Sequence, residues 1–287
     1  MAKAYGLQAI IERETAFGAG AIASLISHRP MILELIGPKY SLLSVSVSSK
    51  VLAYNEMMVP DGVRSKTVFV KAAVNPDVFK PDAAARNNIR GRLGIEDSIV
   101  VGYVGTFQPW HGMEDLIQAA RILHDSSPKM KFLLVGPIPG RVRRLIDSEL
   151  AKTLIFTGPV PYESVPEYIN AFDIAVAPYN VLRSSRRSIG IGSPLKVLEY
   201  MVCGIPTIGS ALPQVAEIID DGRTGLLFPQ GDAKLLAEKI VELAGNSELR
   251  NRIGRNALEK VREQFSWLSF ARRMQLLLEE CLNPQAS

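Results

Sequence analysis

Short runs of apolar residues alternate with amphipathic segments through most of the chain. The apolar runs have the length of strands and lie at residues 99–104, 131–135, 154–157, 174–177, 207–208 and 225–228. The segments between them have the apolar spacing of helices and lie at 113–124, 142–150, 163–171, 195–202, 214–220 and 233–244. Because apolar strands that alternate with helices form parallel sheets covered on both faces, the pattern predicts an α/β fold with a Rossmann-like sheet.

The pattern also divides the chain into domains. Upstream runs at 8–12, 31–35, 50–55 and 67–72 predict strands of a separate unit. Turn-forming residues fill the segment 75–82, which is typical of an interdomain connection. We therefore expect an N-terminal domain at 1–72, a C-terminal domain at 73–265 and a terminal helix at 266–287.

Composition narrows the class of protein. The chain has 287 residues, of which 47% are apolar and 22% charged, as in an ordinary globular protein. Two cysteines, Cys203 and Cys281, argue against a disulfide framework. The three histidines (His28, His111 and His124) lack the spacing of metal ligands. No export signal and no apolar run of about 20 residues is evident, so we expect a cytoplasmic protein.

The charge leaves the kind of partner open. A net charge of +4 and an isoelectric point near 9.0 are compatible with anionic small molecules or with an anionic membrane surface. We therefore also consider a peripheral location at the inner face of the membrane. No nucleic-acid partner is expected.

The first strand of the C-terminal domain ends at Gly105, and the next helix begins after His111 and Gly112. In open α/β sheets the ligand lies at the carboxyl ends of the strands. A glycine there lets the backbone approach a phosphate, and the helix N-terminus offers unpaired N–H groups. The same residues also occur in turns that bind nothing. Neither a G-x-G-x-x-G motif nor a phosphate-loop motif is present, which disfavours a dehydrogenase or an NTPase.

The segment from Ser193 to Pro206 carries the most chemistry. Ser193 can cap the helix that follows, with Pro194 at its first position. Lys196 and Glu199 are three residues apart and therefore share a helix face. A carboxylate can accept two ribose hydroxyls, and a lysine suits a diphosphate. The alternative for this pair is a surface ion pair of little energetic value.

Seven segments, in order and spacing, resemble the family-4 retaining glycosyltransferases. They lie at 104–105, 111–112, 134–136, 156–160, 172–178, 193–204 and 222–227. The resemblance implies the GT-B fold, in which two Rossmann-like domains face each other across a cleft. It also implies transfer of a hexose from a UDP- or GDP-sugar to a glycan, lipid-linked or small-molecule acceptor, with retention of configuration. On this resemblance the enzyme needs no metal and no cofactor beyond its nucleotide-sugar donor.

The resemblance assigns roles to individual residues. Glu199 matches the carboxylate that holds the donor ribose, and Lys196 is a reasonable phosphate contact. His111 stands where many relatives carry a basic residue beside the diphosphate, so activity could depend on pH near about 6.5. Lys196, His111 and Glu199 are thus the candidate catalytic residues. The donor-binding loops are predicted at Gly105 and Thr106, at Ser193, Pro194 and Leu195, and at Pro137 and Val160, which frame the base.

After the replacement of basic residues by Thr106 and His111 beside the diphosphate, the second departure from the family concerns the sugar-binding loop. The family often has a second glutamate eight positions before Glu199, where this chain has Ile191. The sugar must then be held by backbone N–H groups at Gly192 and Ser193 or by another side chain. Arg183, Arg186 and Arg187 form a basic loop nearby that is either solvated or closes over phosphate.

The third departure is the length of the N-terminal domain, since only about 70 residues precede the linker. Either the chain is truncated, or a partner chain or second copy completes the acceptor domain. A nucleotide-sugar-binding subunit without activity and, less favoured, a UDP-sugar epimerase are the alternatives. An apolar stripe on the terminal helix would be an association site if it stays exposed; it comprises Trp267, Phe270, Ala271, Met274, Leu277, Leu278 and Cys281.

Overall fold

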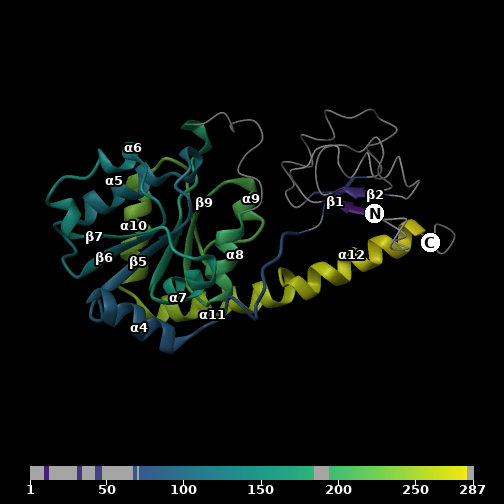
Figure 1. Ribbon diagram of the computed structural model, residues 1–287. Helices are drawn as coiled ribbons and strands as arrows, with labels where there is room; N and C mark the ends of the chain where they lie inside the picture. Colours follow the sequence, from purple (N-terminus) through teal and green to yellow (C-terminus); the bar gives the residue numbers. More distant parts are fainter. Residues whose placement is uncertain are drawn as a thin grey trace. The chain divides into compact units, whose positions relative to one another are not determined.

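The computed structural model describes residues 10–12, 31–33, 43–46, 67–69, 71–183 and 194–282. The chain divides into two compact units (Figure 1). One unit comprises Met1–Ala72 together with Trp267–Ser287, and the other comprises Ala73–Ser266.

The larger unit is built on a six-stranded sheet in the order β10-β9-β8-β5-β6-β7. Every pair of neighbouring strands is parallel. The strands are β5 (Ile99–Val104), β6 (Met130–Val135), β7 (Leu154–Gly158), β8 (Ile174–Ala177), β9 (Thr207–Ser210) and β10 (Leu226–Phe228). Each lies on an apolar run of the sequence. The predicted α/β fold with a parallel, Rossmann-like sheet is therefore confirmed.

Helices cover both faces of this sheet (Figure 1). One face carries α5 (Met113–Leu123), α6 (Gly140–Arg143) and α10 (Ala233–Ala244). The other carries α7 (Val165–Asn170), α8 (Leu195–Val202), α9 (Pro213–Ala216) and α11 (Ser247–Gln264), with α4 (Ala83–Leu93) packed beside α7. Strand order reverses between β8 and β5, which is where open α/β sheets place their ligand.

Strand β5 shows how the two faces are filled. Its side chains alternate, so that Val101 and Tyr103 join the core beneath α5 and α10. A Cβ atom on Gly102 would lie 2.1 Å from the Phe172 ring, so this glycine admits an aromatic ring against the strand. Tyr103 is completely buried, although its polar end lies near the carboxyl edge of the sheet.

Two helix predictions were wrong in extent. The predicted helix at 142–150 is only α6, followed by a 3-10 turn at Leu150–Lys152, because the Asp147 carboxylate caps the Leu150 N–H at 2.9 Å. The helix predicted at 214–220 is the short α9, which ends before a turn in which Thr224 accepts from the Asp220 N–H at 2.9 Å. In both places a side-chain oxygen accepts from a backbone N–H that would donate to a carbonyl oxygen in a longer helix.

The helices α4 and α11 were not predicted. Five of the eleven residues of α4 are Arg or Asn, and only Ile89 and Arg90 are buried. In α11 a narrow stripe of Ile253, Gly254, Ala257 and Val261 faces the core. Both segments are polar on average and bury only a few positions, which explains the omission.

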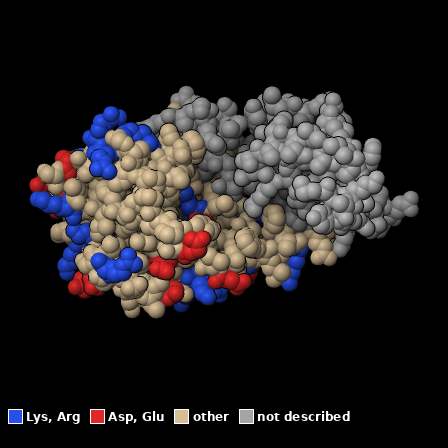
Figure 2. All heavy atoms as spheres, viewed as in Figure 1, with Lys and Arg blue, Asp and Glu red and all other residues tan. Residues whose placement is uncertain are grey.

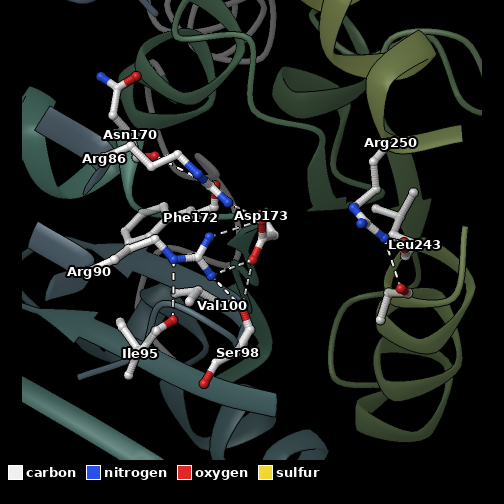
Figure 3. Close-up of polar contacts among 11 residues, drawn as sticks. Arg86, Arg90, Ile95, Ser98, Val100, Asn170, Phe172, Asp173, Leu243 and Arg250 are labelled. Carbon is white, nitrogen blue, oxygen red and sulfur yellow. Dashed lines mark hydrogen bonds and ion pairs between the residues drawn. The ribbon is translucent and has the colours of Figure 1, made fainter. Parts of the chain in front are cut away.

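An aspartate network holds α4 against the amino edge of the sheet (Figure 3). Asp173, directly before β8, accepts hydrogen bonds from the Val100 N–H at 2.8 Å and from the Arg90 guanidinium at 3.0 Å. Its other oxygen binds Arg86. Burial raises the pKa of Asp173, but the Val100 N–H and the two arginines outweigh it and hold that pKa below its usual value. The ionised pair therefore fastens the start of this unit to its sheet.

The smaller unit contains a parallel sheet in the order β1-β2-β3-β4. Its strands are β1 (Ile10–Glu12), β2 (Met31–Leu33), β3 (Leu43–Ser46) and β4 (Thr67–Phe69). Three of them fall within predicted strands, and β3 was missed; the predicted strand at 50–55 and His28 lie outside the described residues.

The terminal helix α12 (Trp267–Leu282) was predicted. On its stripe Trp267 is 58% exposed and Ala271 is exposed, whereas the side chains of Met274, Leu277, Leu278 and Cys281 lie outside the described part of the chain. Among the described residues, none of the helices has the length and apolar character that crossing a membrane requires.

Candidate functional site

A pocket of about 570 Å³ opens at the carboxyl edge of the larger sheet. This volume is within the range of small-molecule sites. The pocket collects most of the residues predicted from the sequence, namely Gly105, Thr106, His111, Pro137, Val160, Leu195, Lys196 and Glu199. Pro194 is buried and does not line it, and Ser193, Gly192, Ile191, Arg186 and Arg187 lie outside the described residues, as does the side chain of Arg183.

Several lining residues were given no role of their own from the sequence, although four of them stand in segments that carry the family resemblance. They are Val104, Val135, Gly136, Pro159, Tyr162, Val165 and Tyr179. Tyr179 could have been found, because it lies only two residues after the end of β8 and therefore near the carboxyl edge. Tyr162, which is 61% exposed and packs edge-on against Phe79, is preceded by no comparable motif.

Two glycines allow close packing of the backbone that lines the pocket. A Cβ atom at Gly136 would lie 2.0 Å from the carbonyl oxygen of Gly105, so the loops after β5 and β6 touch only because this residue has no side chain. A Cβ atom at Gly105 would lie 2.6 Å from the Tyr103 hydroxyl and 3.0 Å from Lys196 Nζ. Both glycines have positive φ angles, 155° at Gly105 and 135° at Gly136, which favours glycine further. The pocket floor therefore exposes bare backbone.

Helix α8 brings Lys196 and Glu199 into the pocket. The helix begins at Leu195, with Pro194 as its N-cap residue and not at the first helical position as predicted, since Pro194 has a non-helical ψ of 62°. Val197, Leu198, Tyr200, Met201 and Val202 are buried and fix the opposite side of the helix. With that side packed, Lys196 in the first turn and Glu199 one turn later both face the pocket.

Lys196 is held in an aromatic box. Its Nζ donates to the Tyr103 hydroxyl at 2.8 Å, and it lies 4.5 Å from the centre of the Tyr103 ring and 5.0 Å from that of Tyr179. Burial lowers the pKa of Lys196 to about 7, although the nearby Glu199 carboxylate acts in the opposite direction. The lysine can therefore gain a full charge when an anion enters.

Glu199 is the carboxylate of the pocket. Burial raises its pKa to about 7, with Lys196 opposing that shift. In the part of the chain that the structure describes, its oxygens have no hydrogen-bond or ion-pair partner. Lys196 and Glu199 thus do not form the surface ion pair considered as the alternative. Two acceptor oxygens in a pocket wall suit the hydroxyls of a sugar.

His111 approaches the same cluster from the 3-10 turn η2 (Pro109–His111). Its Nδ1 accepts from the Gln108 N–H at 3.2 Å and lies 2.9 Å from the Tyr103 hydroxyl. A backbone N–H can only donate, so Nδ1 carries no proton and the neutral ring is protonated at Nε2.

A second arginine–carboxylate contact supports the loop after β5. Arg141 donates to Glu114 at 2.9 Å and to the carbonyl oxygen of Phe107, a residue with a φ of 55° that is unusual for a bulky side chain. Figure 2 shows basic side chains gathered over α6, which carries Arg141 and Arg143. Of these two, Arg141 is paired with Glu114.

The pocket thus combines an ammonium, a carboxylate, exposed backbone and apolar walls. This set suits an anionic ligand that also carries hydroxyl groups. Among the described residues, there is no group of three or more His, Cys, Asp or Glu that could hold a metal ion.

A Rossmann-like sheet with such a pocket at its carboxyl edge defines a nucleotide-binding class of protein. Comparison with protein families is more specific. Residues 98–246, just over half of the chain, match the model for glycosyl transferases group 1. The chain belongs to this family, the GT-B, family-4 group that the motifs indicated.

Curated relatives agree with the family. The α-D-kanosaminyltransferase of Streptomyces kanamyceticus is 29% identical over 211 residues, which are 71% of this chain and 52% of the relative. The D-inositol 3-phosphate glycosyltransferase of Streptomyces avermitilis is 28% identical over 217 residues, 71% of this chain and 44% of the relative. The chain therefore spans about half the length of these relatives.

Solved structures extend the likeness of the fold. The structure of Anabaena HepE in complex with UDP aligns with 97% of this chain and 80% of its own, at a TM-score of 0.82 and 19% identity. HepE has also been solved with UDP-glucose. The described part of the chain thus has the fold of HepE.

Proposed function

We propose that this chain carries the donor site of a retaining glycosyltransferase that uses a UDP- or GDP-linked hexose. The observation that carries the proposal is the convergence of Lys196 and Glu199 with the bare backbone of Gly105 in one pocket. Diphosphate, ribose and base each find a complementary group there. The complexes of HepE with UDP and UDP-glucose support UDP as the first donor to test.

The donor lies along the pocket in a definite order. Lys196 and the backbone at Gly105 and Thr106 face the diphosphate, and Glu199 accepts the ribose hydroxyls. Pro137 and Val160 frame the base. Leu195 at the start of α8, with Pro194 and Ser193 before it in the chain, is assigned to the sugar.

The chemistry follows from this order. The bond between the anomeric carbon and the diphosphate oxygen breaks, and the acceptor oxygen bonds to the same face of that carbon. The acceptor proton passes to the departing diphosphate. Negative charge grows on the leaving group, so the Lys196 ammonium stabilises the transition state more than the bound donor.

The acceptor remains broader, as a glycan, a lipid-linked sugar or a small molecule. The expectation that a partner chain or second copy completes the N-terminal domain stays a prediction. Light scattering at several protein concentrations tests it, together with activity of the isolated chain.

The decisive experiment is ligand binding followed by turnover. UDP, GDP and their hexose conjugates are added with EDTA and, separately, with magnesium, and thermal unfolding is recorded. A ligand at about 100 times its dissociation constant should stabilise the fold by roughly 2.7 kcal/mol in both conditions. Absence of any shift contradicts the proposal, whereas stabilisation without sugar transfer identifies a binding subunit.

A further inference from the structure

Tyr103 belongs to the core, yet its hydroxyl contacts two residues that line the donor pocket. Its side chain, on strand β5, is completely buried in the same core cluster as residues of α5 and α10. Its hydroxyl lies 2.8 Å from Lys196 Nζ and 2.9 Å from His111 Nδ1. Both of these residues line the pocket, whereas Tyr103 does not.

The direction of the hydrogen bonds in this chain of groups follows from Gln108. Its backbone N–H donates to His111 Nδ1, so that nitrogen is an acceptor. The Tyr103 O–H must then donate to Nδ1, which leaves the lone pairs of its oxygen for the Lys196 N–H. The order is therefore Lys196 to Tyr103 to His111.

We propose that Tyr103 is a positioning residue of the donor site, and that His111 acts through it. The hydroxyl, oriented by His111, fixes the Lys196 ammonium where the diphosphate binds. This inference rests on the proposed function, because it names a residue that serves the same site. His111 need not touch the phosphate for this role.

The surroundings of Lys196 make one acceptor oxygen important. Among the described residues, the groups that face Lys196 are Glu199 on its own helix, the ring and hydroxyl of Tyr103, and the ring of Tyr179, with His111 reached through Tyr103. Burial raises the pKa of Tyr103 well above its usual value, so its hydroxyl stays protonated. It therefore orders the ammonium without adding a charge of its own.

The test compares Tyr103→Phe with the wild type by calorimetric titration of UDP across pH. The ring and its contact with the ammonium remain, and only the hydroxyl is lost. Affinity should fall roughly tenfold at neutral pH, because a hydrogen bond to a charged group is lost. The alkaline fall in affinity should also move to lower pH, because the ammonium loses an acceptor that favours its charged form.

Two matched variants separate this role from stability. Tyr168→Phe removes a hydroxyl from α7 outside the pocket and should leave UDP affinity and its pH dependence unchanged. Tyr200→Phe removes a buried hydroxyl that bonds the backbone of Val104 at 2.8 and 3.3 Å. It should lower the unfolding temperature as Tyr103→Phe does, but should not move the alkaline limb.

A measurement on the unaltered protein keeps the inference testable if the variant does not fold. Nitrogen-15 spectra, assigned with His111→Gln, should show His111 protonated at Nε2 and bare at Nδ1. A proton on Nδ1 overturns the inference, and so does Tyr103→Phe with wild-type affinity and pH profile. If the wild type itself binds neither UDP nor GDP, the proposed function fails instead.

Discussion

Lys196 Nζ and the Tyr103 hydroxyl lie 2.8 Å apart although 93 positions separate them in the chain. Lys196 lies in the first turn of the helix at the pocket wall, and Tyr103 belongs to a central strand of the sheet. The proposed donor pocket is thus anchored in the core and does not depend on surface loops alone. A rigid support of this kind is what a charged group needs to act on a leaving diphosphate.

Ligand binding should take up protons above about pH 7 and release protons below it. Above pH 7 free Lys196 is largely neutral, and the diphosphate raises its pKa, so UDP binding takes up a proton. Below pH 7 free Glu199 is largely protonated, and hydrogen-bonding to ribose favours its ionised form, so uridine binding releases one. Titration calorimetry in buffers of different ionisation enthalpy measures both. Lys196→Gln should abolish the uptake and Glu199→Gln the release; an exchange that survives its substitution contradicts the assignment.

Glu199 should bind the ribose hydroxyls and not the phosphate. Glu199→Ala removes acceptors of two hydroxyl hydrogen bonds and should weaken UDP binding by about 2 kcal/mol. The matched ligand is 2′-deoxy-UDP, which the wild type should bind more weakly than UDP. The variant should not distinguish the two nucleotides. Equal discrimination by variant and wild type would place the ribose elsewhere.

Gly105 should not tolerate a methyl group. In Gly105→Ala the new Cβ would press on the Tyr103 hydroxyl and Lys196 Nζ, and the backbone angle disfavours alanine. We expect at least tenfold weaker UDP binding, on the order of 1.4 kcal/mol, with a lowered unfolding temperature. Gly140→Ala is the control, because a Cβ atom at that position would have no neighbouring atom within 4 Å. Similar losses in both variants would show that the effect is general to glycine substitution.

Asp173 should govern stability under acid. Asp173→Asn leaves Arg90, with a side chain 7% exposed, without its counter-charge and should lower the free energy of unfolding by about 3 kcal/mol. Its folded pKa lies below the ordinary 3.8, so the wild-type contribution is present above that pH and is lost as pH falls through the folded value. Denaturant titrations at several pH values measure this difference.

The control for Asp173 is an exposed ion pair. Glu149 and Lys152 are both about two-thirds exposed, and Glu149→Gln should change the free energy of unfolding by less than about 0.5 kcal/mol. If Asp173→Asn has an equally small effect, the buried network is not what fastens α4.

Much of the larger sheet could be predicted because its strands are buried on both faces. Uninterrupted apolar runs such as 99–104 and 174–177 then mark the strands directly, as β5 and β8 show. Helices whose buried face is narrow, such as α11, give no comparable pattern. Segments that end through side-chain capping, as at Asp147, depend on single hydrogen bonds that periodicity does not contain.

The pocket was predictable where chemistry and strand ends coincide. Lys196, Glu199 and Gly105 follow from motif residues at the carboxyl edge, and the structure brings them together. Tyr103 could not be found in this way, because its position within an apolar strand marks it as core. Only the three-dimensional arrangement shows that its hydroxyl is partnered by residues from two other segments.

The Asp173 network lies at the amino edge of the sheet, at the opposite ends of the same strands that open into the pocket. Substitutions at the two edges share no side-chain partners, so their energetic effects should add. Substitutions that bind α4 more firmly to the sheet could therefore be made first. The stability gained would offset the cost of later substitutions around Lys196 and Tyr162. Donor preference and robustness could then be altered independently within this one domain.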